Sequence, residues 1–458
     1  MDRSARCRHR QQQNLVARRA HKTRPVEFFN ILTSPELLEL TDALMPEHRE
    51  RLYPPTVTLS MFMRQTLEAD GSCQKAVNGW AVQRVRDGLT PGSTHTGGYC
   101  RARARLPTTM VSELTRETGR QLCARAQRQW GWQGRPVKLV DGTGISMPDT
   151  KDNQRAYPQP TTQATGVGFP QIRMVAVICL ASGGVLDAGI AQHSGKGSGE
   201  VSILRGLTAA FKPGDVMLAD AAYCNYFLIA TLASIGVDVL FEQNGSRITD
   251  FRRGQSLGNR DHLVDWPKPS RPKWMTHEQY AQFPEQLHVR ETRTEHQVLV
   301  TTMLDHRRVG KRALAALYSR RWDVELDLRN IKTTMGMEVL HCQTPEMNEK
   351  ELWVHLLAYN LIRLLMAQAA CNAGRDPRTL SFKHTLQLWT EWLSHRLTAN
   401  SDSSTLFDLI AQSKVRHRPG RLEPRMRKRR PKPYQWLKKP REETRRDIRQ
   451  FGHPVRPK

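Results

Sequence analysis

The sequence is poor in acidic residues for its number of basic ones. It contains 44 Asp or Glu against 70 Lys or Arg, which gives a formal net charge of +26 at pH 7. Such an imbalance indicates the kind of partner rather than the fold. Clustered Lys and Arg displace counterions from phosphates, so we expect a nucleic-acid partner in preference to a basic protein whose charge only keeps it in solution.

Paired cysteines and long apolar runs are also missing. None of the eight cysteines lies at a Cys-x-x-Cys spacing, which argues against a zinc knuckle and favours reduced thiols. The first 25 residues are Arg-rich without an apolar core, so we expect no signal peptide. The most apolar run, residues 174–191, is interrupted by Gly183-Gly184 and Asp187, and two short strands explain it better than a membrane span. These features predict a cytoplasmic protein.

Several common enzyme motifs are absent as well. The sixteen histidines form no His-Glu-x-x-His pattern. Residues 194–199 superficially resemble a phosphate loop, but Gly197 stands where Ser or Thr is needed, so we interpret them as a loop before a helix. His262 is best explained as a surface histidine. The late helical positions Trp353, Leu356, Leu357 and Leu361 are at core spacing, and we assign them no function.

The basic residues concentrate in two segments. Residues 1–25 contain eight Lys or Arg and one acid, and residues 414–458 contain eighteen Lys or Arg and four acids. Long basic segments usually follow phosphate backbones or remain solvated.

The first part of the chain is predicted to be helical. Residues 28–51, 60–86 and 108–129 carry apolar residues at three- and four-residue spacing, and Pro54-Pro55 and Thr90-Pro91-Gly92 separate them. The basic side chains of 108–129 either face DNA or form a solvated face, and spacing does not choose between the two.

The pattern then changes to alternating strands and helices. Residues 137–141, 216–220 and 237–242 are short apolar runs, and 171–180 with 185–192 indicate a hairpin. Between them we expect a helix to about residue 211, capped by Ser198 with Glu200 in its first turn, and a second helix to about residue 235. This order predicts a mixed α/β layer fold.

Residues 243–295 are rich in Arg, Pro, Gly and Trp and indicate an irregular or β-rich insertion, closed by a strand at 296–304. Helices are predicted at 311–334 and 351–370. We therefore expect seven segments: a basic N-terminal arm at 1–25, a helical DNA-binding domain at 26–130, the first part of the catalytic core at 131–242, the insertion at 243–304, the rest of the core at 305–375, a helical region at 376–413, and a basic Pro-rich tail at 414–458.

Two aspartates stand at the ends of predicted strands. Asp141 and Asp220 each follow a short apolar run, a position from which a side chain projects into an open crevice. Two close carboxylates repel each other unless a cation lies between them, and magnesium, which takes oxygen ligands, suits such a site. The alternative is structural, because Asp-Gly after a strand is first of all a turn signal.

A polar set lies on the predicted helix 311–334. Tyr318, Arg321, Glu325 and Lys332 are three, four and seven residues apart and share one helical face. The opposite, apolar stripe consists of Leu314, Leu317, Val324, Leu328 and Ile331. Glu325 is placed to reach a metal ion, and Arg321 and Lys332 are placed to contact phosphates. The alternative is a solvated face with an Arg321–Glu325 pair, worth a few tenths of a kcal/mol.

The pattern Tyr318-x2-Arg321-x3-Glu325-x6-Lys332 resembles the Tyr-Arg-Glu-Lys signature of bacterial transposases of the fourth insertion-sequence family, which carry an Asp-Asp-Glu triad on a ribonuclease-H-like fold. The resemblance covers nearly the whole chain. Its other motifs are Val140–Thr143, Met147–Thr150, Gly168–Pro170, Gly214–Asp220, Arg247, Asp250–Arg252, Asp261-His262 and Arg418–Pro431.

This resemblance implies a DNA transposase with a ribonuclease-H-like core that cuts the element's ends and attacks target DNA with the freed 3′-OH. It implies that two magnesium ions, with manganese as a substitute, are bound by three carboxylates: Asp141, Asp220 and Glu325. It also implies DNA contacts by five residues: Tyr318, Arg321, Lys332, Arg247 and Arg252. The implied partners are terminal inverted repeats and target DNA, bound by a homodimer in a nucleoid-associated setting.

The sequence departs from the family pattern in two places. Asp220 is followed by Ala221-Ala222, where the family often has a basic residue. Residues 290–300 hold no aromatic, whereas some relatives have a Trp there that stacks on a flipped base. The nearest candidates, Trp266 and Trp274, are better explained as core residues or as residues packed under a loop.

Two other functions are compatible with a basic chain of this kind. One is a metal-dependent nuclease that cuts DNA without joining it. The other is a DNA-binding protein, including a catalytically decayed transposase. The ordered acids disfavour a pure binder, because binding phosphates does not require three carboxylates.

Overall fold

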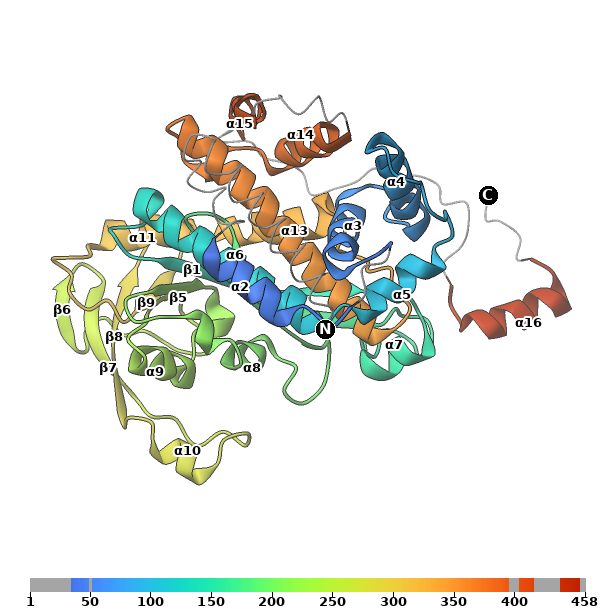
Figure 1. Cartoon of the computed structure of the whole chain (residues 1–458). Coiled ribbons are helices and arrows are strands. Elements are labelled where there is room, and N and C mark those ends of the chain that lie inside the picture. The colour runs from blue at the N-terminus through green and yellow to red at the C-terminus, as the bar shows by residue number, and fades with distance from the viewer. Residues whose placement is uncertain (1–33, 49–51, 395–402, 416–436, 454–458) are drawn as a thin grey trace.

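The computed structural model describes residues 34–48, 52–394, 403–415 and 437–453 (Figure 1). The predicted basic arm at 1–25 and the basic motif Arg418–Pro431 lie outside the described residues.

One sheet runs through the molecule. In chain order its strands are β1 (Val137–Ser146), β2 (Gln171–Cys179), β3 (Val185–Gln192), β4 (Val216–Ala219), β5 (Asp238–Glu242), β6 (Gln255–Gly258), β7 (Asp261–Pro267), β8 (Gln286–Arg293) and β9 (Val298–Thr301). Their spatial order is β3-β2-β1-β4-β5-β9-β8-β7-β6. Strands β1, β2 and β3 form an antiparallel meander, whereas β4 and β5 run parallel to β1. This arrangement of the first five strands is the ribonuclease-H-like one, and the predicted mixed α/β fold is confirmed.

The described residues also form helices, some of which cover the sheet. They are α2 (Pro35–Leu44), α3 (Pro55–Leu67), α4 (Cys73–Arg86), α5 (Gly97–Arg105), α6 (Thr108–Trp130), α7 (Lys151–Ala156), α8 (Glu200–Arg205), α9 (Tyr226–Ser234), α10 (His277–Ala281), α11 (Lys311–Ser319), α12 (Trp322–Arg329), α13 (Pro345–Asn372), α14 (Phe382–Ser394), α15 (Ser403–Gln412) and α16 (Arg441–Phe451). Short turns of helix are η2 (Thr208–Ala210), η3 (Ala221–Tyr223), η4 (Asn330–Thr334) and η5 (Pro377–Thr379).

The two faces of the sheet belong to different cores, because successive strand residues point to opposite sides. In β4, Val216 and Leu218 lie in the core shared with α11, α12 and α13. Met217 and Ala219 lie in the core shared with α8 and α9. The sheet is therefore a middle layer between two sets of helices, and the parity of a strand residue decides which set it meets.

The helix predicted at 108–129 is confirmed as α6, whereas the one predicted at 60–86 is divided. The single helix predicted at 60–86 is two helices, α3 and α4, separated by residues 68–72. The separation is local in origin: Ser72 accepts a hydrogen bond from the Lys75 amide and caps α4, and the Asp70 carboxylate accepts one from the Ser72 amide. Periodicity alone missed this polar break.

Two further expectations around the sheet are wrong. Asp141-Gly142 is not a turn, because β1 continues to Ser146 and pairs with β2 throughout. Ser198 does not cap the helix that follows it: its hydroxyl donates to the Gly195 carbonyl, and α8 starts after Gly199 without a side-chain cap.

The insertion is β-rich, and it extends the core sheet. Strands β6, β7 and β8 form antiparallel pairs, and β9 joins them to β5. In Figure 1 these strands continue the sheet on one side, and α10 lies at the end of a long excursion from it.

The predicted helix at 311–334 is interrupted twice. Between α11 and α12 the amides of Arg320 and Arg321 bond to carbonyls three residues back, which tightens the turn. At the other end η4 is a π-helical turn, in which the Met335 amide bonds to the Asn330 carbonyl. The apolar stripe from Leu314 to Ile331 is nevertheless buried, as predicted.

Helix α13 is the central core helix. It is long and apolar enough to span a membrane by length and composition, but 89% of its most apolar window is buried inside the protein. It packs against α6 and α3 and, on the C-terminal side, against α14 and α15 (Figure 1). Its position accounts for its composition without a membrane.

Candidate active site

Asp141 stands at the point where β1 loses one neighbour. The parallel pairing with β4 ends at Leu139, whereas the antiparallel pairing with β2 continues past Asp141. The side chain therefore sits on a strand held from one side and open on the other. Its carboxylate accepts a hydrogen bond from the Gly142 amide at 2.8 Å.

Asp220 occupies the equivalent place on the next strand. It directly follows β4 and caps the short helix η3, accepting a hydrogen bond from the Ala222 amide at 2.9 Å. Strand parity puts Asp141 and Asp220 on the face that carries α11 and α12, because Leu139 and Leu218, two residues before each, lie in that core. The two predicted acids thus lie on the same face of the sheet, just past the point where the pairing of β1 with β4 ends.

The surroundings of Asp141 disfavour its charged form. Burial, with the negative charges of Asp220 and Glu200, raises the pKa of Asp141 to about 6, although the Gly142 amide and the Arg321 guanidinium act in the opposite direction. A carboxylate pair in this condition is stabilised by a cation.

Glu325 lies on α12, which packs against β1. Its side chain is 42% exposed and accepts a hydrogen bond from Arg321 at 3.2 Å. The charge of Arg321 also lowers the pKa of Asp141, so the same guanidinium acts on the helix acid and on a strand acid. The Arg321–Glu325 pair expected for a solvated helix face is therefore present, and its arginine also acts on Asp141.

Within the described ranges, no group of three or more His, Cys, Asp or Glu side chains is close enough together to hold a metal ion. The donor set nevertheless fits a hard divalent cation: Asp141 and Asp220 offer carboxylate oxygens just past the point where the pairing of β1 with β4 ends, and their mutual repulsion is relieved by positive charge. Glu325 completes such a set only if its side chain turns from Arg321 toward the aspartates, a rotamer change open to an exposed glutamate.

Tyr318, at the end of α11, has its hydroxyl 3.3 Å from the Glu242 carboxylate, to which it donates. Burial and the Glu242 charge raise the pKa of Tyr318, which keeps the phenol protonated. Glu242 is the last residue of β5, so the third parallel strand also ends in an acid. Sequence reasoning missed Glu242, although the rule that selected Asp141 and Asp220 applies to it unchanged.

Glu200 is a second acid that the sequence did not single out. It is the first residue of α8, on the face of the sheet opposite α12, and accepts a hydrogen bond from the buried Tyr223 at 3.2 Å. A Cβ atom on Gly142 would lie 2.3 Å from the Glu200 carboxyl carbon, so the glycine is what lets this carboxylate approach Asp141. Glycine is therefore required at position 142 by the packing of Glu200 and not by a turn.

Lys332 lies in the π-helical turn η4 and is half-buried. Its ammonium makes no hydrogen bond or ion pair with the part of the chain that the structure describes. It is accordingly available to a phosphate.

The predicted DNA contacts of the insertion differ from each other. Arg247 stacks on Trp266, with its guanidinium carbon 3.8 Å from the ring centroid, whereas Arg252 is exposed and paired with Asp250 at 2.8 Å. Trp266 is buried, as expected, but Trp274 is 46% exposed and lies under Arg205 at 3.5 Å.

His262 is not a surface residue. It is 1% exposed, its Nε2 atom lies 3.1 Å from Glu291, and its Nδ1 atom lies 2.7 Å from the Arg253 carbonyl. Trp266 donates to the other oxygen of Glu291 at 2.8 Å. The Asp-His motif thus belongs to the interior of the insertion.

The known proteins that this chain is similar to are transposases. Residues 132–361 match the family model described as a transposase DDE domain. The chain is 27% identical over 388 residues to "Transposase InsG for insertion sequence element IS4" of Escherichia coli (strain K12), which covers 81% of this chain and 84% of that protein. A solved structure titled "Cryo-EM structure of piggyBac transposase synaptic complex with hairpin DNA (SNHP)" aligns over 86% of both chains at 9% identity and a TM-score of 0.43.

Proposed function

The chain belongs to the transposase DDE domain family, and from that premise we propose that Asp141, Asp220 and Glu325 are its catalytic carboxylates. It is a DDE-type DNA transposase of the IS4 type, and its chemistry depends on a divalent metal. The recognition of the family from the Tyr-Arg-Glu-Lys spacing is thereby confirmed. We assign the metal as magnesium, because hard carboxylate oxygens are the ligands that it prefers.

The observation that supports this assignment best is the meeting of three elements at one place. Asp141 lies just past the last residue of β1 that pairs with β4, Asp220 directly follows β4, and Glu325 lies on the helix that packs against β1. The Arg321 guanidinium, bonded to Glu325 and acting on Asp141, joins the two sides.

Each residue has a role that follows from its position. Asp141 and Asp220 hold metal, and Glu325 completes the ligand set. Divalent ions bound there stabilise the attacking and leaving oxygens of an in-line displacement at phosphorus. Arg321 and Lys332 bind phosphate oxygens beside the scissile bond, and Tyr318 joins them when its single O–H turns from Glu242 to a phosphate oxygen. Arg247 and Arg252 contact DNA further along the insertion.

The reaction is hydrolysis at the ends of the element followed by attack of the freed 3′-OH on target DNA. The partners we propose are the terminal inverted repeats and the target duplex, with two protomers pairing two ends. A homodimer suits this reaction because two ends must be cut and joined in one complex.

A strand-transfer assay tests the proposal. The full chain is mixed with magnesium and a linear DNA that carries the sequences bracketing this reading frame in its host genome, and cut and joined products are separated on a gel. We expect both. Cleavage without joining identifies a nuclease, and binding without cleavage identifies a decayed transposase. Activity that persists in Glu325→Ala contradicts the assignment of the triad.

A further inference from the structure

A buried charge network lies behind the helix that carries Glu325. Asp327 follows Glu325 by two residues, which places the two carboxylates about 200° apart around α12. Glu325 faces outward, whereas Asp327 is 0% exposed. A buried carboxylate is retained only with strong partners, so its contacts are informative.

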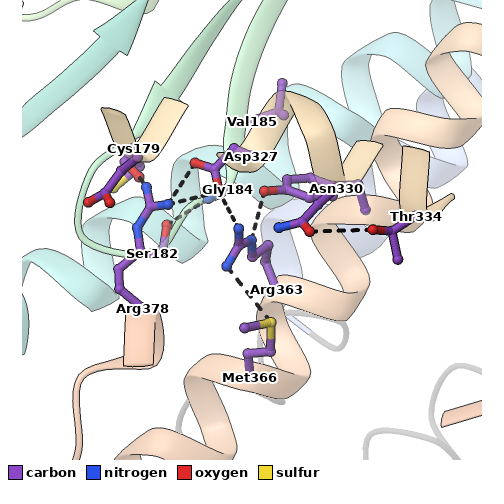
Figure 2. Close-up of polar contacts among 12 residues, drawn as sticks. Cys179, Ser182, Gly184, Val185, Asp327, Asn330, Thr334, Arg363, Met366 and Arg378 are labelled. Atoms are coloured by element: carbon purple, nitrogen blue, oxygen red, sulfur yellow. Dashed lines mark hydrogen bonds and ion pairs between the residues drawn. The ribbon is translucent and has the colours of Figure 1, made fainter. Parts of the chain in front are cut away.

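Two arginines from different elements converge on Asp327 (Figure 2). Arg363 of α13 donates to its Oδ1 atom, and Arg378 of η5 donates to both oxygens at 2.8 and 2.7 Å. Arg363 also donates to the Tyr359 hydroxyl at 2.7 Å. Asp327 and Arg363 are buried and the Arg378 side chain is 9% exposed, and together the three carry a net charge of +1.

Arg378 continues the connection to the sheet. Its Nε atom donates to the Leu180 carbonyl at 2.8 Å, and a terminal nitrogen donates to the Cys179 carbonyl at 3.0 Å. Cys179 is the last residue of β2 and lies opposite Lys138 of β1, three residues before Asp141. A continuous set of polar contacts thus joins the helix of Glu325 to the strand pair that holds Asp141.

The turn between β2 and β3 is shaped to receive this network. Gly183 has a φ of +76°, and a Cβ atom there would lie 2.7 Å from the guanidinium carbon of Arg363. A side chain at this position would displace the arginine, so the turn and the network depend on each other.

Stability alone does not account for the network. Burying one carboxylate and two guanidinium groups carries a desolvation cost that often exceeds their attraction, and apolar side chains of the same volume fill such a space as well or better. Charged hydrogen-bonded pairs are directional. Because Arg363 belongs to α13 and Arg378 to η5, their bonds to Asp327 fix the rotation of α12 about its axis and its height above β1. These are the two coordinates that decide where Glu325 lies.

We propose that Asp327 is a positioning residue, which with Arg363 and Arg378 holds α12 so that Glu325 reaches the metal ions held by Asp141 and Asp220. This inference rests on the proposed function, because it assigns Asp327 a purpose only if Glu325 is a ligand.

The test compares two network variants with a control. Asp327→Asn removes the charge and keeps the shape. Arg378→Gln leaves the Asp327–Arg363 pair balanced and cuts the connection to Cys179 and Leu180. Asp261→Asn is the control, because Asp261 is also a buried carboxylate with a two-point bond to an arginine, Arg290, but lies in the insertion.

The first readout is Mn²⁺ binding to the DNA-free protein, titrated by electron paramagnetic resonance. The second is the Mg²⁺ concentration at half-maximal cleavage. Loss of a group that orients a metal ligand weakens metal binding about 10- to 100-fold. We expect that weakening in Asp327→Asn and Arg378→Gln and wild-type metal binding in Asp261→Asn, with DNA affinity measured in EDTA unchanged in all three.

Wild-type metal binding in folded Asp327→Asn or in Arg378→Gln overturns the inference. So does an equal weakening in Asp261→Asn, which would assign the effect to stability. If Asp327→Asn does not fold, as judged by circular dichroism, Arg378→Gln decides alone. Glu325→Gln separates the two levels: if it binds metal and cleaves as the wild type does, the triad is wrong, whereas its loss of both with normal network variants refutes only the role of Asp327.

Discussion

The two sides of the proposed active site are held in different ways. On the strand side, Asp141 and Asp220 are fixed by the ladders of β1, β2 and β4, which are backbone hydrogen bonds. On the helix side, Glu325 lies on the eight-residue helix α12, which is interrupted at both ends and held from behind by the side chains of Arg363 and Arg378. Backbone ladders tolerate substitution of side chains, whereas a side-chain network is lost with one residue.

This difference explains why the two sides respond to separate kinds of change. The position of a strand acid changes when the acid is replaced or when volume is added under the strand. The position of Glu325 changes when the charges around Asp327, which Glu325 does not contact, are removed. The predictions below test that division from the largest expected effect to the smallest.

Removing either strand acid should abolish the chemistry and leave the fold. Asp141→Asn and Asp220→Asn keep their size and their acceptor for the nearby amide, so circular dichroism and DNA binding should match the wild type. Cleavage should fall by about 10³-fold or more, because a carboxylate that would hold metal is lost. Loss of folding would instead show that these residues serve as structural caps.

Adding one methyl group beneath the strand should damage the strand side alone. In Gly142→Ala the new carbon meets the Glu200 carboxylate, so either Glu200 or β1 shifts, at a cost of about 1–3 kcal/mol in unfolding free energy. We expect slower cleavage and a lower melting temperature.

Gly144→Ala is the matched control for this change. It lies on the same strand with the same parity, and its new carbon meets atoms no closer than 3.9 Å. Equal damage in both variants would mean that any alanine disturbs β1, and the contact with Glu200 would lose its importance.

On the helix side, Lys332→Ala should weaken binding to DNA without affecting folding. Losing one phosphate contact lowers the slope of log affinity against log salt by about 1, and the effect is largest at low salt. Lys311→Ala serves as the control, because that ammonium already donates to the Asn259 carbonyl. Unchanged affinity of Lys332→Ala at low salt would remove Lys332 from the interface.

The smallest effect is expected for Tyr223→Phe, which removes the hydroxyl that donates to Glu200. Glu200 keeps its place above Gly142 by packing, so we expect a loss of about 0.5–1.5 kcal/mol in unfolding free energy and a modest decrease in cleavage. Tyr226→Phe removes a hydroxyl that donates to the Pro284 carbonyl, away from the acids. If both variants cleave DNA equally, Glu200 does not need its tyrosine.

The sequence predicted what short-range patterns control. Strand-end aspartates follow apolar runs, and the spacing from Tyr318 to Lys332 is visible in one line of text. A mixed α/β layer fold followed from the order of strands and helices, and the resemblance to the transposase family implied its ribonuclease-H-like form. Each of these depends on residues close together in the chain.

What the sequence did not predict depends on distant partners. The continuation of β1 through Asp141-Gly142 is imposed by β2, and the same dipeptide alone favours a turn. His262 and Asp327 belong to residue types that are usually exposed, and only the arrival of Glu291 or of two arginines shows that they are buried. The sequence indicated Glu200 as a first-turn helix residue, but its closeness to Asp141 depends on the packing of α8 against Gly142.

The return of the insertion through β9 has a mechanical consequence. A domain that moves as a lid needs a joint free of ladder bonds, but β9 pairs with β5 on one side and β8 on the other. A force on β6 and β7 therefore bends the whole sheet, including β4, the strand that Asp220 directly follows. DNA that bends against the insertion would therefore strain the strand side directly.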